Sequence, residues 1–313
     1  MLENVNLKLR LSRDEYDHSL PGLQRRLYDL EKACWDHKIP SVILLEGWDA
    51  AGKGGAIASL TQRLDPRGFK VHGIHPPRTF EQGFPWLWRF WLKTPERGEM
   101  VIFDQSWYGR VLHDRVDQTV SKAAWRAAFR DIVDFERMLA DDGAVILKFF
   151  LHIGRKEQKR RFRKMEDNPL EAWRVGEEDH ARQRQYDQYL IAIEEMLELT
   201  ESAHAPWTIV EASSRWWARR KIFETVIAAL EHRLGRAAPP YDRSEDIEER
   251  EADLREAMSS LDADSLDPSD SLDPSLDSES VPAPHAKPGS KTHTKPSPKP
   301  IKKPRTKKET RDA

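Results

Sequence analysis

Short aliphatic runs alternate along the first 240 residues with longer segments in which apolar positions recur every three to four residues. This alternation is typical of a parallel sheet whose strands are joined by crossover helices. We predict strands at residues 41–46, 69–74, 100–103, 144–153 and 207–211. We predict helices at residues 13–37, 53–64, 121–141, 155–164, 178–200 and 215–234. The pattern therefore predicts an α/β fold.

The pattern ends at about residue 241, where the aromatic residues stop. Residues 265–269 and 271–275 are both Ser-Leu-Asp-Pro-Ser, and residues 287–308 mix Lys, Pro, Thr and Ser. Such segments cannot bury enough apolar surface to offset the entropy of an ordered chain. The length of 313 residues alone favours about two domains. We predict instead one domain over residues 1–242 and a disordered tail over residues 243–313.

Charge separates the same regions. The formal net charge is only −2. Residues 244–280 hold fourteen acidic and two basic side chains, whereas residues 281–313 hold ten basic and two acidic ones. The rest of the chain is therefore slightly basic, and the tail has an acidic segment followed by a basic one.

Three classes of protein are excluded by composition. No segment approaches the roughly 18 apolar residues of a membrane-spanning helix. The first residues carry Lys8, Arg10 and Arg13 without the apolar stretch of a signal peptide. Cys34 is the single cysteine, so an internal disulfide framework and a cysteine-based metal site are excluded. We expect a soluble cytoplasmic protein.

The most specific motif is Gly-Trp-Asp-Ala-Ala-Gly-Lys-Gly-Gly at residues 47–55. It follows a predicted strand and opens a predicted helix, which is the context of a phosphate-binding P-loop. Glycines let backbone N–H groups point inward, and Lys53 adds a charge for phosphoryl oxygens. The alternative is an ordinary glycine-rich turn. The glycines proposed to bind phosphate are Gly47, Gly52, Gly54 and Gly55.

This loop differs from the usual P-loop at two positions. Gly54 stands where a Ser or Thr hydroxyl normally holds Mg²⁺. Asp49 lies inside the loop, where a carboxylate repels phosphate unless a cation lies between them. We hypothesise that Asp49 supplies part of the missing metal site or orients the acceptor phosphate.

A second carboxylate, Asp104, ends the third predicted strand. An acid at the end of an apolar strand next to a P-loop is the Walker B arrangement, which reaches Mg²⁺ directly or through water. Arg110 and Arg115 follow on a predicted short helix. Either arginine neutralises charge on a transferring phosphoryl group or forms a surface salt bridge.

A basic segment, residues 154–176, follows the fourth predicted strand and is broken by Asn168-Pro169. It is either a solvated surface of mixed charge or a mobile basic lid over a phosphate site. Trp86, Trp88, Phe90 and Trp91 could stack a nucleobase, but a helix face packed on a sheet is the preferred interpretation. His72, His75 and His152 are interpreted as residues at strand ends rather than metal ligands.

Several motifs together resemble the polyphosphate kinase 2 family, especially its polyphosphate:AMP phosphotransferases. The resemblance covers about residues 12–236 and includes the loop form Gly-x-Asp-x-x-Gly-Lys, which matches Asp49 and Lys53. The other motifs lie at residues 64–67, 87–91, 103–110 and 205–207. The family implies a three-layer P-loop kinase fold: a five-stranded parallel sheet with helices on both faces and a helical lid, here at about residues 154–180.

The family also implies a reaction, cofactors and partners. A phosphoryl group passes reversibly between inorganic polyphosphate and a nucleoside mono- or diphosphate: AMP, ADP, GMP or GDP. The cofactor is Mg²⁺, with Mn²⁺ as a second candidate, and the protein is a homodimer or homotetramer without a membrane partner. AMP to ADP is the favoured reaction, and ADP to ATP is the second.

Transferred to this chain, the resemblance gives each site residue a role. Asp49, Lys53, Asp104 and Arg110 are catalytic, and both aspartates also hold the metal. The lid residues that bind phosphate are Arg160, Arg161 and Arg174.

The chain departs from the family pattern at three places. Gln105 replaces a common Arg, and Arg174 and His180 replace Lys and Trp. Ser213-Ser214-Arg215 replaces a sequence similar to Asn-Asp-Lys. Arg174 keeps the charge but offers a planar fork instead of an ammonium. These changes leave transfer chemistry in place and leave nucleotide preference and direction open.

Two other functions remain alternatives. One is an ATP-dependent nucleotide kinase on the same fold, and the other is a non-catalytic scaffold that binds polyanions. The tail is either a solubilising appendage or a polyanion-capturing segment. In the second case its Lys/Pro part binds polyphosphate or nucleic acid while its acidic part competes. We expect no other contact with nucleic acid.

Overall fold

The computed structural model describes residues 2–235. The predicted disordered tail and its boundary at residue 242 lie outside the described residues. Within them, no helix is long and apolar enough to cross a membrane.

A five-stranded parallel sheet forms the centre of the molecule, with the strand order β2-β3-β1-β4-β5. The strands are β1 Ser41–Gly47, β2 Phe69–Gly73, β3 Met100–Asp104, β4 Val145–His152 and β5 Trp207–Glu211. The strand predictions are confirmed to within one residue at each end. The first six residues of β1 are all buried, because a parallel strand at the centre of a sheet is covered on both faces.

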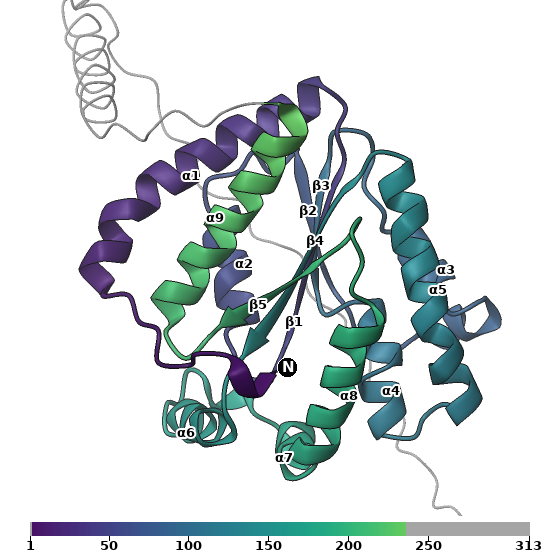
Figure 1. Ribbon diagram of the computed structural model, residues 1–313. Helices are drawn as coiled ribbons and strands as arrows, with labels where there is room; N and C mark the ends of the chain where they lie inside the picture. The colour runs from purple at the N-terminus through teal and green to yellow at the C-terminus, as the bar shows by residue number, and fades with distance from the viewer. Residues whose placement is uncertain (1, 236–313) are drawn as a thin grey trace, which may run out of the picture. The chain divides into compact units, whose positions relative to one another are not determined.

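Helices cover both faces of the sheet, as Figure 1 shows. One face carries α1 Arg13–Asp36, α2 Lys53–Thr61 and α9 Arg215–Leu234. The other carries α3 Trp88–Trp91, α4 His113–Val116, α5 Lys122–Asp141 and α8 Tyr186–Leu199. This confirms the predicted three-layer α/β arrangement.

Two helices, α6 Arg155–Glu166 and α7 Glu177–Arg184, lie beyond the carboxyl ends of the strands. They occupy the segment expected to form the lid, and its closure stays a prediction. Short 3-10 turns complete the secondary structure of residues 2–235: Leu2–Asn4, Glu81–Gly83, Trp107–Arg110 and Ala172–Arg174.

The predicted single helix over residues 178–200 is wrong, because the structure contains two helices, α7 and α8, separated at Gln185. The N–H of Gln185 is shared between the carbonyls of Ala181 and Arg182, and its ψ of 17° leaves the helical range. Residues 177–185 are nearly all polar, so no change in hydrophobic period marks the break.

The remaining helix predictions are close. The bounds of α9 are as predicted, whereas α2 ends three residues early at Thr61 and α6 continues two residues further to Glu166. The tryptophan-rich segment packs on itself and on α5: Trp88 stacks on Phe84 at 4.1 Å, and Trp91 meets Phe135 edge-on at 4.7 Å.

Candidate phosphate-binding site

The phosphate loop connects β1 to α2 at the carboxyl edge of the sheet. Gly47 has φ 139°, and a Cβ there would lie 2.4 Å from the carbonyl oxygen of Leu151 on the neighbouring strand. Gly52 has φ 110° and precedes the first residue of α2, Lys53. The loop therefore requires glycine at both positions, one for space and one for backbone conformation.

Lys53 lies over the loop that it follows. Its Nζ donates to the carbonyl of Gly47 at 2.9 Å and to that of Trp48 at 3.4 Å. The ammonium thus stands beside the N-terminus of α2, where the backbone dipole also favours an anion. Lys53 therefore lies at the glycine loop, and its contact with phosphate stays a prediction.

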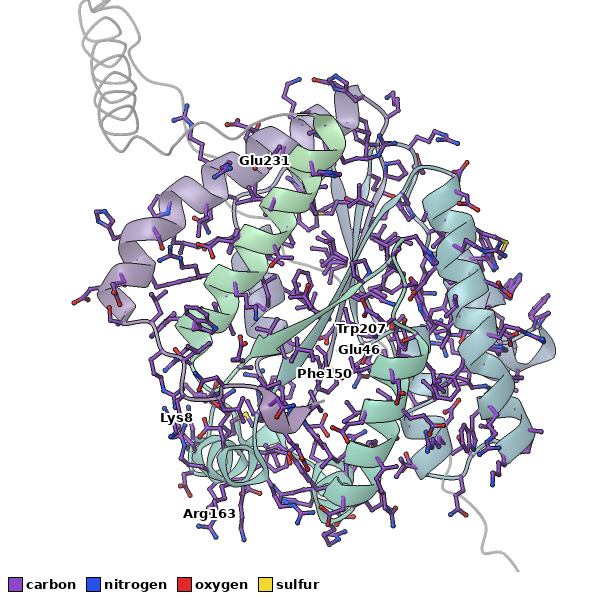
Figure 2. All side chains as sticks on the ribbon, in the orientation of Figure 1. Lys8, Glu46, Phe150, Arg163, Trp207 and Glu231 are labelled. Atoms are coloured by element: carbon purple, nitrogen blue, oxygen red, sulfur yellow. The ribbon has the colours of Figure 1, made fainter. Side chains whose placement is uncertain are left out.

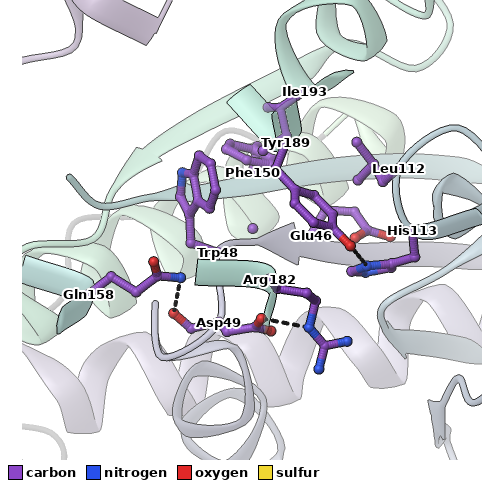
Figure 3. Close-up of a pocket in the computed structure, with 11 residues that line it drawn as sticks. Glu46, Trp48, Asp49, Leu112, His113, Phe150, Gln158, Arg182, Tyr189 and Ile193 are labelled. Carbon is purple, nitrogen blue, oxygen red and sulfur yellow. Dashed lines mark hydrogen bonds and ion pairs between the residues drawn. The ribbon is translucent and has the colours of Figure 1, made fainter. Parts of the chain in front are cut away.

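Asp49, inside the loop, is held by a cation from α7. The Nε of Arg182 lies 3.1 Å from Oδ2 of Asp49, as Figure 3 shows. Arg182 also lies 3.5 Å from Asp179 of its own helix. Sequence reasoning missed Arg182, because a basic residue on a polar helix carries no local signal of its partner.

Asp104, the last residue of β3, lies at the same edge of the sheet as the loop. Its Cα pairs in register with Leu45, which is two residues before Gly47. Among residues 2–235 its carboxylate has no ion-pair or side-chain hydrogen-bond partner, in contrast with the paired Asp49. The two carboxylates therefore lie at the same edge of the sheet, and their roles stay a prediction.

Glu46 is a third carboxyl group at this edge that sequence reasoning missed. It is fully buried between the two carboxylate-bearing turns, and the Oγ of Ser106 donates to its Oε1 at 2.7 Å. Burial raises the pKa of Glu46 to about 7, and the charge of Asp104 adds to the rise, while Ser106 and Lys53 oppose it. The available signal was a charged residue at the end of an apolar strand.

The turn after Asp104 is anchored by a buried polar network. Trp107 Nε1 and Tyr108 OH both donate to Oε1 of Glu136, at 3.0 and 2.7 Å. Lys148 donates to Oε2 of Glu136 and to the carbonyl of Thr200, at 2.9 and 2.7 Å. Burial raises the pKa of Glu136 and lowers that of Lys148, and both side chains are 0% exposed.

The two arginines that follow Asp104 differ in their surroundings. Arg110 donates to Asp114 at 3.1 Å, lies over the ring of Trp86, and keeps a buried Nε without a hydrogen bond. Arg115 instead pairs with Glu195 at 2.6 Å and lies over Trp125. Both arginines thus form the kind of salt bridge that was their alternative interpretation, and the charge-neutralising role of Arg110 stays a prediction.

Gln105, which replaces the family's usual Arg, points its amide towards His113, 3.5 Å from Nε2. The other ring nitrogen of His113 lies 3.2 Å from the hydroxyl of Tyr189 (Figure 3). His113, Tyr189, Asp49 and Arg182 all line a cavity of about 30 Å³ beside the loop. Burial is the main cause that lowers the pKa of His113.

The predicted lid arginines lie in three different settings. Arg160 is 64% exposed and pairs with Glu157, and Arg174 pairs with Glu171 at 3.4 Å on an exposed turn. Arg161 is only 17% exposed and reaches the backbone of the phosphate loop. Trp173, which precedes Arg174, is 82% exposed.

A shallow basic groove lies along the outer side of α6. Arg163, labelled in Figure 2, projects outward there, at the edge of the molecule away from the interior residues Glu46 and Phe150. The groove is lined by Lys156, Lys159, Arg160, Arg163, Lys164 and Asp167.

The carboxylates fit a magnesium ion by their chemistry. Within residues 2–235 no group of three or more His, Cys, Asp or Glu side chains gathers as a metal site. Mg²⁺ is commonly held by one or two carboxylates together with water and substrate phosphates. Asp104 and the loop residue Asp49 supply hard oxygen donors of that kind. Their predicted role as metal ligands is chemically consistent with the site and stays a prediction.

Residues 10–237 match the family model described as polyphosphate kinase 2. The chain is 39% identical over 238 residues to a polyphosphate:AMP phosphotransferase of Pseudomonas syringae pv. tomato, covering 75% of this chain and 47% of the relative. It is 34% identical to an AMP/ADP-polyphosphate phosphotransferase of Meiothermus ruber, covering 73% of this chain and 86% of the relative. The chain thus spans about half the length of the Pseudomonas relative.

Solved structures agree with these sequence relatives. The crystal structure of polyphosphate kinase 2 from Arthrobacter aurescens TC1 superposes with a TM-score of 0.72 at 27% identity. The match covers 82% of this chain and 93% of that chain.

Proposed function

Because the chain belongs to the polyphosphate kinase 2 family, we propose that it transfers a phosphoryl group between inorganic polyphosphate and a nucleotide. AMP is the favoured acceptor, giving ADP, and ADP is the second. The observation that carries the proposal is the phosphate loop, where Lys53, the α2 N-terminus and the Asp49 carboxylate meet at one edge of the sheet. The names of the Pseudomonas and Meiothermus relatives support polyphosphate as donor.

The transfer requires positioning and charge neutralisation rather than covalent help from the protein. A P–O bond of the polyphosphate terminus breaks as a phosphate oxygen of AMP forms a new one, so the donor becomes one unit shorter. The transition state spreads negative charge over the equatorial oxygens. Lys53 and the loop N–H groups would bind the terminal phosphate, and Arg110 would lie towards the developing charge.

Asp49 and Asp104 would hold Mg²⁺, which when bound neutralises phosphate charge and draws donor and acceptor together. Arg182 already neutralises Asp49 in the ligand-free protein. It therefore keeps the loop carboxylate from repelling an incoming phosphate. The exposed cations of the α6 groove would bind the remaining polyphosphate chain, because five of its six lining side chains are basic.

The test is an assay of the full chain with long-chain polyphosphate and AMP, ADP, GMP or GDP, with Mg²⁺ or Mn²⁺. We expect ADP to form from AMP. Loss of a preorganised charge contact lowers the rate by about 10²–10³-fold. We therefore expect Lys53→Ala and Asp49→Asn each to lower kcat/KM by at least that factor. Arg137→Ala, an exposed change on α5, is the matched control and should keep full activity.

Three outcomes contradict the proposal. Near-normal turnover of either variant would show that the phosphate loop does not take part in the reaction. Phosphorylation of AMP by ATP but not by polyphosphate indicates an ATP-dependent kinase. Binding of polyphosphate without any transfer indicates a scaffold.

A further inference from the structure

Helix α6 presents two different faces, because residues three or four positions apart share a helix face. The outer face carries the exposed cations of the basic groove. The inner face carries Gln158 and Arg161, whose side chains are buried or nearly so. Their hydrogen bonds go to the phosphate loop, so the two faces have different partners.

Arg161 uses all three of its nitrogen atoms on the protein itself. Nη1 donates to two loop carbonyls, Nη2 donates to two carbonyls of the turn between β5 and α9, and Nε donates to a carboxylate on its own helix. The partners are Ala50 O at 2.9 Å, Ala51 O at 3.0 Å, Ala212 O at 2.6 Å, Ser213 O at 3.1 Å and Glu157 Oε1 at 2.7 Å. One side chain thus joins α6, the phosphate loop and the end of β5.

Gln158 extends this contact by one residue, since its Nε2 donates to the carbonyl of Asp49 at 3.2 Å (Figure 3). Three successive loop carbonyls, those of Asp49, Ala50 and Ala51, therefore accept hydrogen bonds from α6. In a trans peptide the C=O and the following N–H point in opposite directions. Holding these carbonyls towards α6 turns the N–H groups of the same peptides away from it.

The loop also needs support from outside. Ala50 has φ 61°, a left-handed conformation that costs a residue with a Cβ about 1–2 kcal/mol. The side chains of Ala50 and Ala51 are too small to anchor the loop by themselves. The hydrogen bonds of Arg161 supply the contacts that such a backbone requires in order to persist.

We infer that Arg161 is a positioning residue that shapes the phosphate loop before any substrate binds, rather than a direct ligand of polyphosphate. Its neighbour Arg160 has the opposite setting: it is 64% exposed on the basic groove and, within residues 2–235, its side chain bonds only to Glu157. The two adjacent arginines therefore form a matched pair, one directed at the loop and one at solvent.

The first test is amide hydrogen exchange of the ligand-free full chain, read over residues 48–56 and 211–215. We expect Arg161→Ala to speed exchange of both segments by about tenfold or more. Without Arg161, local opening of these segments no longer has to break its hydrogen bonds and therefore costs less free energy. Arg161→Lys should speed it by a smaller factor, since an ammonium cannot reproduce the planar fork. Arg160→Ala should leave both segments unchanged. Unchanged exchange in Arg161→Ala overturns the inference.

The second test separates kcat from KM and presupposes the proposed phosphoryl transfer, which the exchange test does not. We expect Arg161→Ala and Arg161→Lys to lower kcat by about 10²-fold and about tenfold, respectively, with the KM for polyphosphate within about threefold of wild type. Arg160→Ala should instead raise this KM and weaken its salt dependence.

Two controls keep the inference falsifiable. The melting temperature of each variant separates general unfolding from a local effect, and Arg161→Lys is the milder variant if Arg161→Ala fails to fold. A raised KM with unchanged kcat in Arg161→Lys shows a direct ligand and overturns the inference. If wild type transfers no phosphoryl group, the proposed function fails while the exchange result still decides the role of Arg161.

Discussion

Two turns at the same edge of the sheet carry the two candidate carboxylates, and the backbone around each carboxylate is held differently. The phosphate loop, with Asp49, is held from outside through its backbone carbonyls, which accept from α6. The turn after β3, with Asp104, is held from inside through its own side chains, which bond to buried Glu46 and Glu136.

The composition of each turn explains this difference. Between Gly47 and Gly52 the phosphate loop has one large apolar side chain, Trp48, which is buried and donates from Nε1 to Nδ1 of His152 at 3.0 Å. Apart from Trp48 and Asp49, the loop consists of glycine and alanine, whose small side chains offer few contacts for anchoring. The turn after Asp104 contains Ser106, Trp107 and Tyr108, which are all buried. The small residues that follow Trp48 therefore depend on a neighbouring element for support, whereas three consecutive buried side chains anchor the turn after Asp104 in the core.

The largest effect is expected from Lys148→Met, a change in the buried network that anchors the turn after Asp104. The change leaves Glu136 buried without its countercharge. Removing one partner of a buried pair costs about 3–5 kcal/mol, so the melting temperature should fall by roughly 6 °C or more. The loss should be larger at pH 8 than at pH 5.5, because the stranded carboxyl can bind a proton at the lower pH.

The matched control is Lys148→Met combined with Glu136→Leu, which removes both charges. It should recover much of the lost stability, since apolar replacement of a buried pair is often neutral or stabilising. A single Lys148→Met variant that melts within about 1 °C of wild type would show that the network does not anchor the turn.

Glu46→Gln tests the group that lies between the two turns. The pKa of Glu46 is raised from 4.5 to about 7, so the folded state favours the protonated carboxyl. Ionisation of Glu46 therefore removes stability as pH rises from about 4.5 through about 7, and the full cost applies above that range. Gln has no such titration. The free energy of unfolding of the variant relative to wild type should increase by about 2–3 kcal/mol between pH 5 and pH 8.

Chemical denaturation at both pH values measures this difference. Glu198→Gln, an exposed change on α8, is the control and should show no comparable pH-dependent gain. A constant difference between Glu46→Gln and wild type across the range contradicts the role of burial at Glu46.

Gln158→Met should have the smallest effect, because it weakens the outer support of the phosphate loop by one bond. A neutral hydrogen bond contributes about 1 kcal/mol, and the change also removes the buried Oε1 of Gln158, which has no partner. These effects oppose each other, so unfolding free energy should change by less than about 1 kcal/mol. A calorimetric loss above about 3 kcal/mol would contradict this prediction, because it would show that the contact of Gln158 stabilises the protein by far more than one neutral hydrogen bond.

Much of the fold follows from patterns that act locally. The central strands β1, β3 and β4 were predictable because buried parallel strands are apolar on both faces. The partly exposed edge strands β2 and β5 were predictable as short β-branched runs between helices that have an apolar period. The break at Gln185 was not predictable, because it falls in a polar stretch where no period changes.

Site residues were predictable where a motif joins them in sequence. The loop glycines, Lys53 and Asp49 belong to one motif, and Asp104 ends a recognisable strand. Arg182 and Glu46 were missed because their partners are distant in the chain or hidden in the core. Arg110 and Arg115 looked equivalent in the sequence, and both form an ion pair and lie over a tryptophan ring. Only packing decided the partners, which are Asp114 and Trp86 for Arg110 and Glu195 and Trp125 for Arg115.

The sequence by itself determined the α/β layers and the phosphate loop, because both depend on residues close together in the chain, and it placed Asp104 at the end of a strand. The tertiary structure decided which side of α6 faces that loop, and therefore gave adjacent Arg160 and Arg161 different partners. The physical reason is that Arg161 bonds to backbone carbonyls. Every residue type has that group, so no sequence pattern can reveal which carbonyl a distant side chain will reach.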